Sequence, residues 1–475
     1  MTKSSEIRRV KIGMLGSGTV GEAIQELVFN GNLPGRFGVV LELAKIYTRE
    51  PRRKRWYPMN RALFTTNPQE VTDHPEVEIV VEVLGSQDER DHPTFKGYIL
   101  RALQKGKSVV TSDKAVLARF GREILAVAQR YNQAIRFEAC VGGGIPIIGS
   151  LTEGLSAEEP EAIYGIVNGT CNYILSEMKA GGKSYEEALR EAQLRGYAET
   201  NPEADTSGKD AEAKIIILAA VTFGIQLEPG LVSRKGIEKI NPIDFLYAHQ
   251  KGSSTIKHLA VARNKNRAIE AFVSPMLVPK DHFLSTIDGI SNAIFFKGKR
   301  SQGSPSNTRG KDRWVQTGRE DWNYVFVGPG AGGGPTAVAI LGDVCELARQ
   351  PGPHRSAPGV PMMPSPFTVQ AEDQMSAHFY VRFVVKDKSG IVGDICQTFG
   401  EKGINISEVW QLSHSQEELK SLVQRYHFRE EPWQILPFVI TVERTTAGQI
   451  KKALEIIRRK DFMLVDPLWL PIWKN

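Results

Sequence analysis

The sequence has few cysteines and no long apolar run. Its 475 residues include four cysteines, Cys140, Cys171, Cys345 and Cys396, which lie far apart and form no Cys-x-x-Cys pair. This scatter argues against a disulfide framework and against a structural zinc site. No apolar stretch is long enough to span a membrane, and the N-terminus has no apolar targeting core. We therefore expect a cytoplasmic protein.

The sequence also lacks a strong excess of charge and a high aromatic content. The formal net charge of +6 is spread along the chain, and aromatic residues make up 8% of it. Proteins that bind nucleic acid usually gather basic and aromatic residues on one surface, so we expect neither nucleic acid nor a membrane as partner. A chain of 475 residues exceeds what one hydrophobic core usually supports, so two or three domains are expected.

Changes of pattern divide the chain and predict an α/β protein. Over residues 1–150, β-rich runs such as VKIGMLG and VEIVVEVLG alternate with helical segments, which predicts a Rossmann-type doubly wound domain. Residues 151–349 predict a second, α+β domain, with a polar, mobile surface insertion at 298–322. Residues 350–375 carry six prolines and predict a linker. The pattern of residues 376–475 predicts a compact βαββαβ module.

A glycine-rich turn follows the first predicted strand. Its Gly-x-Gly-x-x-Gly spacing lets the backbone turn tightly, approach a pyrophosphate and point the free amides of the next helix at it. Such a motif can also be a plain strand–helix turn, but its position at the first junction favours dinucleotide binding. The predicted cofactor contacts here are Gly16, Ser17, Gly18, Thr19, Val20 and Gly21.

The end of the second predicted strand is basic. Arg49 begins the run REPRRKR, where dinucleotide-binding domains usually have an acid that bonds the ribose. A cation there suits a 2′-phosphate, so we expect NADP(H) to be preferred, with NAD(H) as the alternative. The run could instead be a solvated surface loop, and Glu50 could serve a ribose.

A lysine and an aspartate share one face of an apolar helix. Asp210 and Lys214 are four residues apart, on a face that continues through Ile217 and Val221. A lysine on a buried stripe is costly unless it is paired or functional. The structural alternative is that Asp210 and Lys214 form an ordinary ion pair on the helix surface, with Ser207 as the N-terminal cap of that helix.

Several motifs resemble those of homoserine dehydrogenases. The segment GYAETNPEADTSGKDAEAK (196–214) is similar to the family signature GYAExDPxxDxxGxDxxxK. Further similar motifs, in family order, are TSDKAVLA (111–118), FEACVGGGIPII (137–148), IVNGTCNYIL (166–175) and VGPGAGGGPTAVAILGDV (327–344). The resemblance implies reversible NAD(P)-dependent interconversion of L-homoserine and L-aspartate 4-semialdehyde, in the biosynthesis of threonine, methionine and isoleucine. It also implies that residues 151–349 form the catalytic and dimerisation domain.

The resemblance also implies roles for individual residues. Lys214 would be the general acid/base, with Lys114, beside the nicotinamide and the reacting oxygen, as the alternative proton acceptor. We expect a desolvated lysine beside a second cation to have a lowered pKa that suits proton transfer. Glu199 would hold the substrate ammonium. The other implied substrate contacts are Asp205, Asp210, Gly169 and Thr170.

Further implied sites concern the cofactor and a cation. Gly332 and Ser86 would lie near the cofactor, although the family usually has Gly-Gly where this chain has Gly85 and Ser86. Oxygen ligands suit a hard cation, and the resemblance implies a sodium or potassium site. Its residues would be Glu138, Val141, Gly143 and Ile145.

The C-terminal module resembles an ACT domain. FYVRFVVKDKSGIVGDICQTFGEKGINISEVWQ is similar to the family pattern, with Ser389 in place of a common proline. The resemblance implies edge-to-edge pairing in a homodimer or homotetramer and L-threonine as effector. The alternative is a pairing module without a ligand. The implied effector contacts are Asp387, Gly390, Ile391, Asn405 and Ile406.

Two rival functions remain open at this point. Cys171 could be the nucleophile of an acylating semialdehyde dehydrogenase, although no histidine motif accompanies it. The chain could also be a non-catalytic sensor of NADP and amino acids. The intact set of acids and lysines speaks against a sensor.

Overall fold

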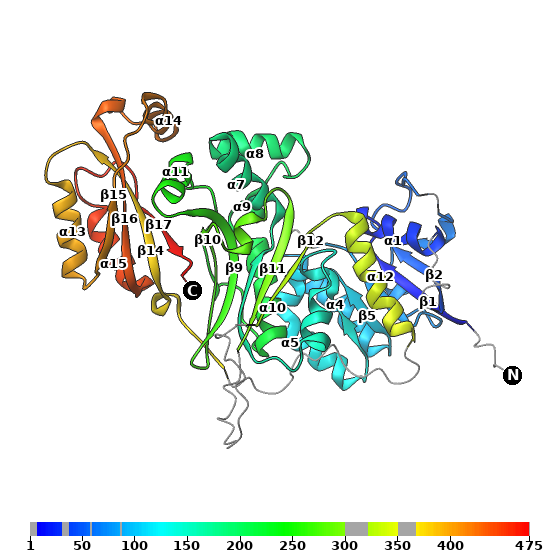
Figure 1. Ribbon diagram of the computed structural model, residues 1–475. Helices are drawn as coiled ribbons and strands as arrows, with labels where there is room; N and C mark the ends of the chain where they lie inside the picture. The colour runs from blue at the N-terminus through cyan, green and yellow to red at the C-terminus, as the bar shows by residue number, and fades with distance from the viewer. Residues whose placement is uncertain are drawn as a thin grey trace, which may run out of the picture.

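The computed structural model describes residues 7–30, 38–57, 59–85, 88–299, 322–349 and 367–474. The molecule is elongated, with one sheet-and-helix unit near the N-terminus, a long sheet through the middle and a smaller unit at the far end (Figure 1). Within the described ranges, no helix is long and apolar enough to cross a membrane.

The first unit is a six-stranded parallel sheet with strand order β3-β2-β1-β4-β5-β6. Its strands are β1 (Arg8–Leu15), β2 (Val39–Tyr47), β3 (Phe64–Thr65), β4 (Ile79–Glu82), β5 (Ser108–Thr111) and β6 (Ile135–Arg136). Its helices include α1 (Thr19–Asn30), α3 (Gln69–Thr72), α4 (His92–Gln104) and α5 (Lys114–Arg130). All residues of β4 and β5 are buried, as expected for strands covered on both faces. This strand order confirms the predicted Rossmann-type domain.

The second unit is built on five antiparallel strands in the order β12-β11-β7-β9-β10. They are β7 (Pro160–Ile166), β9 (Ser254–Lys265), β10 (Ala268–Pro279), β11 (Ser291–Gly298) and β12 (Trp322–Pro329). Its helices include α7 (Gly169–Gly181), α8 (Tyr185–Leu194), α9 (Glu203–Thr206), α10 (Lys209–Phe223) and α11 (Pro242–Gln250). The predicted insertion joins the hairpin strands β11 and β12, and its residues 300–321 lie outside the described part of the chain.

After β12 the chain returns to the first unit as α12 (Gly333–Arg349). The apolar residues Ala337, Ile340 and Val344 of this helix share one core with Val10 and Ile24. The predicted boundary at residue 349 assigned this helix to the second domain, whereas its packing is on the nucleotide-binding sheet.

The C-terminal unit has the predicted strand–helix order with one addition. Its elements are β14 (Ser376–Lys386), α13 (Ile391–Glu401), β15 (Ile406–Trp410), α14 (Gln416–Tyr426), β16 (Ile435–Thr446), α15 (Ala447–Ile457) and β17 (Leu468–Ile472). The sheet order is β17-β14-β16-β15, and all its neighbours are antiparallel. The extra helix α14 begins with a Ser415–Glu418 capping box, a signal that the sequence reading missed.

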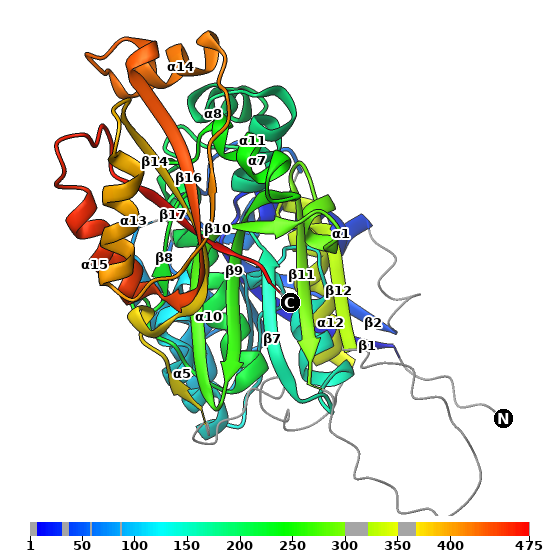
Figure 2. The same cartoon turned by 60° about the vertical axis from the view of Figure 1, so that its left-hand side comes forward.

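The C-terminal unit continues the sheet of the second unit. β17 pairs with β10 through Leu277 and Ile472, so one sheet runs from the second unit into the C-terminal unit (Figure 2). The predicted linker also takes part, because β13 (Thr368–Val369) pairs with β10. Side chains from both units fill one hydrophobic cluster that includes Leu259 and Phe383.

A buried ion pair crosses the same seam. Arg382 of β14 binds the carboxylate of Asp244 on α11, and the side chains of the two residues are 2% and 0% exposed. The hydroxyl of Tyr380 donates to the same carboxylate at 2.6 Å. A buried pair of this kind is costly to break, since loss of one partner leaves a charge without compensation. This boundary between the second unit and the C-terminal unit, called the seam below, is therefore held rigidly by the Asp244–Arg382 pair.

We expect Arg382→Met to lower the free energy of unfolding by about 3–5 kcal/mol, because it leaves the Asp244 carboxylate buried without its cation. The measurement is urea unfolding followed by circular dichroism. The matched control is Arg459→Met, an exposed position shortly after the end of α15, which should change stability by less than about 0.5 kcal/mol. Equal stability of the two variants would contradict this account of the seam.

Candidate active site

Two of the three glycines of the turn after β1 are required for steric reasons, and the third borders open space. Gly16 has φ +115°, and a Cβ there would lie 2.6 Å from the carbonyl oxygen of Val83. A Cβ at Gly21 would lie 2.8 Å from the oxygen of Gly16. Gly18 faces open space, with nothing within 4 Å of the position of its Cβ. The turn thus leaves room for a ligand at the N-terminus of α1, where free amides favour an anion.

A second helix begins at the same turn. Gly332 has φ +116°, and α12 starts at Gly333, where a Cβ would lie 3.0 Å from Cγ2 of Thr19. Thr19 and Val20 open α1, so the N-termini of both helices meet here. The predicted return of Gly332 to this side of the sheet agrees with that geometry. Ser86 lies outside the described residues.

The cation that reaches the turn is Arg55. Its Nε donates to Oγ of Ser17 at 2.9 Å, and its Nη2 donates to Oγ1 of Thr48 at 3.3 Å. Arg49, the residue chosen from the sequence, is exposed and makes no hydrogen bond or ion pair to the described residues. Arg49 and Arg55 belong to the same basic run of the sequence. The loop folds back so that Arg55, and not Arg49, contacts Ser17.

A buried acid supports the turn from β4. Oε1 of Glu82 accepts the amide of Leu84 at 2.8 Å, and Oε2 accepts the hydroxyl of Thr111. Burial, and then the charge of Asp113, raises the pKa of Glu82 to about 8. A carboxyl that is largely protonated at neutral pH adds little negative charge beside a diphosphate site. The sequence reading missed Glu82, although an acid at the end of an apolar strand was a visible signal.

The two lysines of the family motifs meet on one carboxylate. Lys214 donates from Nζ to Oδ2 of Asp210 at 2.7 Å and to the carbonyl of Val167 at 2.6 Å. Lys114, at the start of α5, lies 3.1 Å from Oδ1 of Asp210. The side chain of Lys214 is 10% exposed and that of Lys114 is 40% exposed. Lys114 is therefore open to solvent where α5 of the first unit meets α10 of the second, and Lys214 is buried beside it.

Asn168 extends this network to a second carboxylate. Its Nδ2 donates to Oδ1 of Asp205 at 2.7 Å and to Oδ2 of Asp210 at 2.9 Å, while its Oδ1 caps α7 by accepting the amide of Cys171. The sequence reading did not select Asn168, although it lies within a recognised motif. The structure thus brings Lys114, Lys214, Asp205 and Asp210 together.

The charges in this network determine its protonation. Burial by itself would raise the pKa of Asp210, but the charges of Lys214 and Lys114 outweigh it and hold that pKa well below its usual range. The charge of Asp210 in turn raises the pKa of Lys114 to about 12. The expectation of a lowered lysine pKa is wrong for Lys114, because the carboxylate lies between the two ammonium groups. Burial, followed by the charge of Asp210, raises the pKa of Asp205.

Other predicted substrate contacts lie around this network. Gly169 begins α7, and a Cβ there would lie 2.7 Å from the oxygen of Ile290. The hydroxyl of Thr170 donates to the carbonyl of Tyr197 at 2.7 Å, which holds the segment that carries Glu199. The carboxylate of Glu199 is exposed and has no partner within the described residues. It is not part of the buried cluster.

The predicted cation loop is buried and tightly turned. The carboxylate of Glu138 accepts the amides of Ile148 at 2.7 Å and Gly149 at 2.8 Å. The carbonyls of Val141 and Gly143, both in buried residues, accept no hydrogen bond from the described part of the chain. The carbonyl of Ile145 accepts the amide of Ile147 at 2.8 Å. Both oxygens of Glu138 thus accept backbone amides, and the open oxygens of the loop are the carbonyls of Val141 and Gly143, which are of the kind a hard monovalent cation takes.

The predicted effector residues fall into two separate groups. Asp387, Gly390 and Ile391 follow β14, whose last residue pairs with Ile435 of β16. Asn405 and Ile406 begin β15, where Ile406 pairs with Val442 of the same strand. Seven residues of β16 separate these positions, roughly 23 Å along a strand. The structure does not bring the two groups together within one chain.

The geometry argues against a cysteine nucleophile. Cys171 is fully buried, and its Sγ donates to the carbonyl of Asp205 at 3.2 Å. Burial, and then the charge of Asp205, raises the pKa of its thiol well above the usual value. A thiol held in this way is a poor source of thiolate.

Comparisons with known proteins agree with the geometry. A family model described as homoserine dehydrogenase matches residues 146–345, and a model described as its NAD binding domain matches residues 16–138. The homoserine dehydrogenase of Pseudomonas aeruginosa is 32% identical over 455 residues, which cover 94% of this chain and 95% of that protein. The homoserine dehydrogenase of Mycobacterium leprae is 36% identical over 86% of this chain and 87% of its own length.

Solved structures show the same relationship. A homoserine dehydrogenase from Thiobacillus denitrificans has a TM-score of 0.80 and 28% identity, and the match covers 98% of this chain and 99% of that one. A hyperthermophilic archaeal homoserine dehydrogenase in complex with NADPH has a TM-score of 0.56 and 26% identity over 73% of this chain and all of its own. Since relatives more than 30% identical match most of its length, the chain belongs to the homoserine dehydrogenase family.

Proposed function

We propose that the site interconverts L-homoserine and L-aspartate 4-semialdehyde, with Lys214 moving the proton and Lys114 stabilising the charge on the reacting oxygen. The observation that carries this proposal is the carboxylate of Asp210. It holds the ammonium groups of Lys214 and Lys114 within 3.1 Å, one on each oxygen, where the first and second units meet. This arrangement places two cations beside one position for a substrate oxygen.

The two lysines have different capacities. When bound, the nicotinamide supplies or accepts the hydride at the substrate carbon. Lys214 uses two of its three N–H donors on Val167 and Asp210, so one donor remains for the substrate oxygen. In reduction it donates the proton to the forming alkoxide, and in oxidation it takes the proton back. Lys114, with a pKa of about 12, stays an ammonium and stabilises negative charge on that oxygen.

The acids beside the lysines suit the amino group of homoserine. Asp205 is held by Asn168 next to Asp210, and Glu199 is exposed on the neighbouring segment. We assign the substrate ammonium to these two carboxylates, with Gly169 and Thr170 shaping the adjacent wall. Asp210 is then left to orient the lysines, since its oxygens are taken by them and by Asn168.

For the cofactor we propose a preference for NADP(H). The supporting observation is Arg55, a guanidinium fixed over Ser17 beside the end of β2, where the adenosine ribose lies in dinucleotide-binding folds. A guanidinium matches a phosphate by geometry and by charge. We also propose that Glu138 and the carbonyls of Val141, Gly143 and Ile145 hold sodium or potassium, which would fix the loop that leads out of the first unit.

For regulation we propose that the C-terminal unit is an ACT domain that pairs with a second copy and binds L-threonine. The separation of Asp387 from Asn405 supports pairing, since two copies side by side can bring one group from each chain together. Threonine could inhibit only through different affinities for two arrangements of the protein.

We expect Lys214→Met to lower kcat at least about a hundredfold, because the reacting oxygen loses its proton donor. The measurement is steady-state oxidation of NADPH with aspartate semialdehyde, with NADPH binding followed separately by fluorescence. The matched control is Lys209→Met, an exposed lysine on the same helix paired with Glu89, which should keep normal turnover. A folded Lys214→Met protein with normal kcat would transfer the proton role to Lys114.

Arg55→Ala should raise KM for NADPH about tenfold or more and KM for NADH much less, because a charged hydrogen bond to a 2′-phosphate is lost. Arg49→Ala provides the comparison, since that side chain has no contact with the turn. Equal increases for both cofactors would mean that Arg55 only supports Ser17. A larger effect of Arg49→Ala would restore the choice made from the sequence.

Threonine regulation is best tested with point variants. Removal of everything after residue 350 would strip β17 and β13 from β10 and expose the shared core, so a truncated protein would not test regulation alone. We expect Asn405→Ala to keep normal turnover and to lose threonine inhibition. Lys420→Ala on α14 is the control that keeps both. Full-length protein that neither binds nor responds to millimolar threonine in calorimetry and kinetics would end this proposal.

A further inference from the structure

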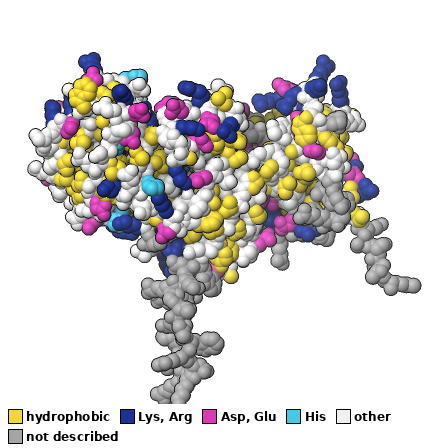
Figure 3. Space-filling view, turned by 45° about the horizontal axis from the view of Figure 1, so that its top comes forward, with side chains coloured by type: hydrophobic (Ala, Val, Ile, Leu, Met, Phe, Trp, Pro, Cys, Tyr) yellow, Lys and Arg dark blue, Asp and Glu magenta, His cyan; other side chains and the backbone are white. Residues whose placement is uncertain are grey.

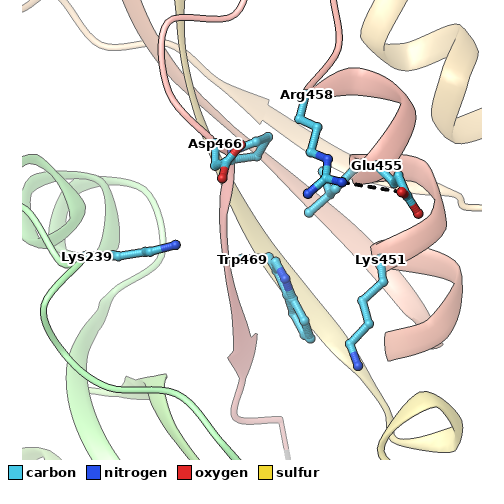
Figure 4. A pocket seen from close by; sticks show the side chains of 8 residues that line it. Lys239, Lys451, Glu455, Arg458, Asp466 and Trp469 are labelled. Atoms are coloured by element: carbon cyan, nitrogen blue, oxygen red, sulfur yellow. Dashed lines mark hydrogen bonds and ion pairs between the residues drawn. The ribbon is translucent and has the colours of Figure 1, made fainter. Parts of the chain in front are cut away.

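A cavity of about 310 Å³ lies at the seam between the second unit and the C-terminal unit. Lys239, on the loop before α11, forms one side of it. Lys451 of α15 and Arg458, which directly follows that helix, lie across from it. Asp466, just before β17, and Trp469, within β17, lie between them (Figure 4). None of these residues belongs to the catalytic cluster or to the proposed threonine site.

The charges around this cavity are only partly balanced. Lys451 binds Glu372 at 2.6 Å and Asp373 at 2.9 Å, and Arg458 lies 3.4 Å from Glu455. The ammonium of Lys239 and the carboxylate of Asp466 have no hydrogen bond or ion pair with any described residue. One free positive and one free negative group therefore face the same space.

The floor of the cavity is apolar. The indole of Trp469 and the side chain of Leu454 line it, and Leu454 is 6% exposed. The Nζ atom of Lys235 lies over the Trp469 ring, on one face of the indole. A ligand that suits this surface carries both charges at one end and an apolar group at the other.

We propose that this cavity binds a free amino acid with an apolar side chain. Its carboxylate would pair with Lys239, its ammonium with Asp466, and its side chain would lie on Trp469 and Leu454. A ligand with only one of the two charges would leave either Lys239 or Asp466 unpaired and would bind more weakly.

The cavity is connected to the catalytic cluster through the loop that carries Lys239. The amide of Ile237 in this loop donates to the carbonyl of Thr206 at 3.0 Å, and Thr206 directly follows Asp205 in α9. Arg425 of α14 holds the other end of the loop by donating to the carbonyl of Glu238 at 2.6 Å. A ligand on Lys239 therefore acts on the segment that positions Asp205, so its binding should change KM for homoserine.

The test is calorimetric titration of the full-length protein with L-leucine. We expect a Kd of about a millimolar, and binding at least about tenfold weaker in Lys239→Gln and in Asp466→Asn. Lys452→Gln and Asp461→Asn, exposed charges of the same unit outside the cavity, are the matched controls and should bind as the wild type does. The single-charge analogues 4-methylpentanoate and 3-methylbutan-1-amine should bind at least about tenfold more weakly than leucine.

Kinetics separate this site from the catalytic one. Leucine should change KM for homoserine in the wild type and in the control variants but not in Lys239→Gln, whose turnover without leucine should be normal. Equal leucine binding by Lys239→Gln, Asp466→Asn and the wild type would overturn the proposal, as would no binding up to about 50 mM. Binding that depends on Lys239 without any change of KM would overturn the connection to Asp205.

Discussion

The carboxylate of Asp210 joins the two halves of the catalytic centre. Lys114 belongs to the first unit and Lys214 to the second, and each binds a different oxygen of this one side chain. Two ammonium groups held this close would repel each other, so the negative charge between them is a condition for their coming together. The distance between the two ammonium groups at the reacting oxygen therefore depends on how the second unit sits against the nucleotide-binding sheet.

The sequence predicted this centre because its residues lie in short contiguous motifs. The spacing of Asp210 and Lys214 fixes them on one helix face, and the turn Gly16–Gly21 follows from local steric demands. Lys114 follows a buried strand at the carboxyl edge of a parallel sheet, which is where such folds bind ligands. Most residues of the site could therefore be predicted from local sequence patterns.

Contacts between distant segments were not predictable in the same way. Asn168 reaches Asp205 and Asp210 only because the start of α7 lies against α9 and the first turn of α10. Arg55 reaches Ser17 only through the fold of its loop. The C-terminal unit shows the same limit, since the order of its own elements was visible but its pairing with β10 was not. The proline-rich composition of residues 350–375 indicated a break in secondary structure. It could not indicate that sheet pairing and the Asp244–Arg382 ion pair join the C-terminal unit to the second unit.

The return of α12 to the first unit has a mechanical consequence. The chain crosses between the two units twice, once after β6 and once after β12. The crossings touch, because the amide of Gly144 donates to the carbonyl of Pro329 at 3.0 Å and a Cβ at Gly143 would lie 2.6 Å from the oxygen of Gly330. Because the two connections contact each other, they form one hinge point. If the nucleotide-binding unit opened relative to the second unit, it would rotate about this point. The loop from Glu138 to Ile145 forms one side of that hinge point, so a cation bound there would stiffen the hinge.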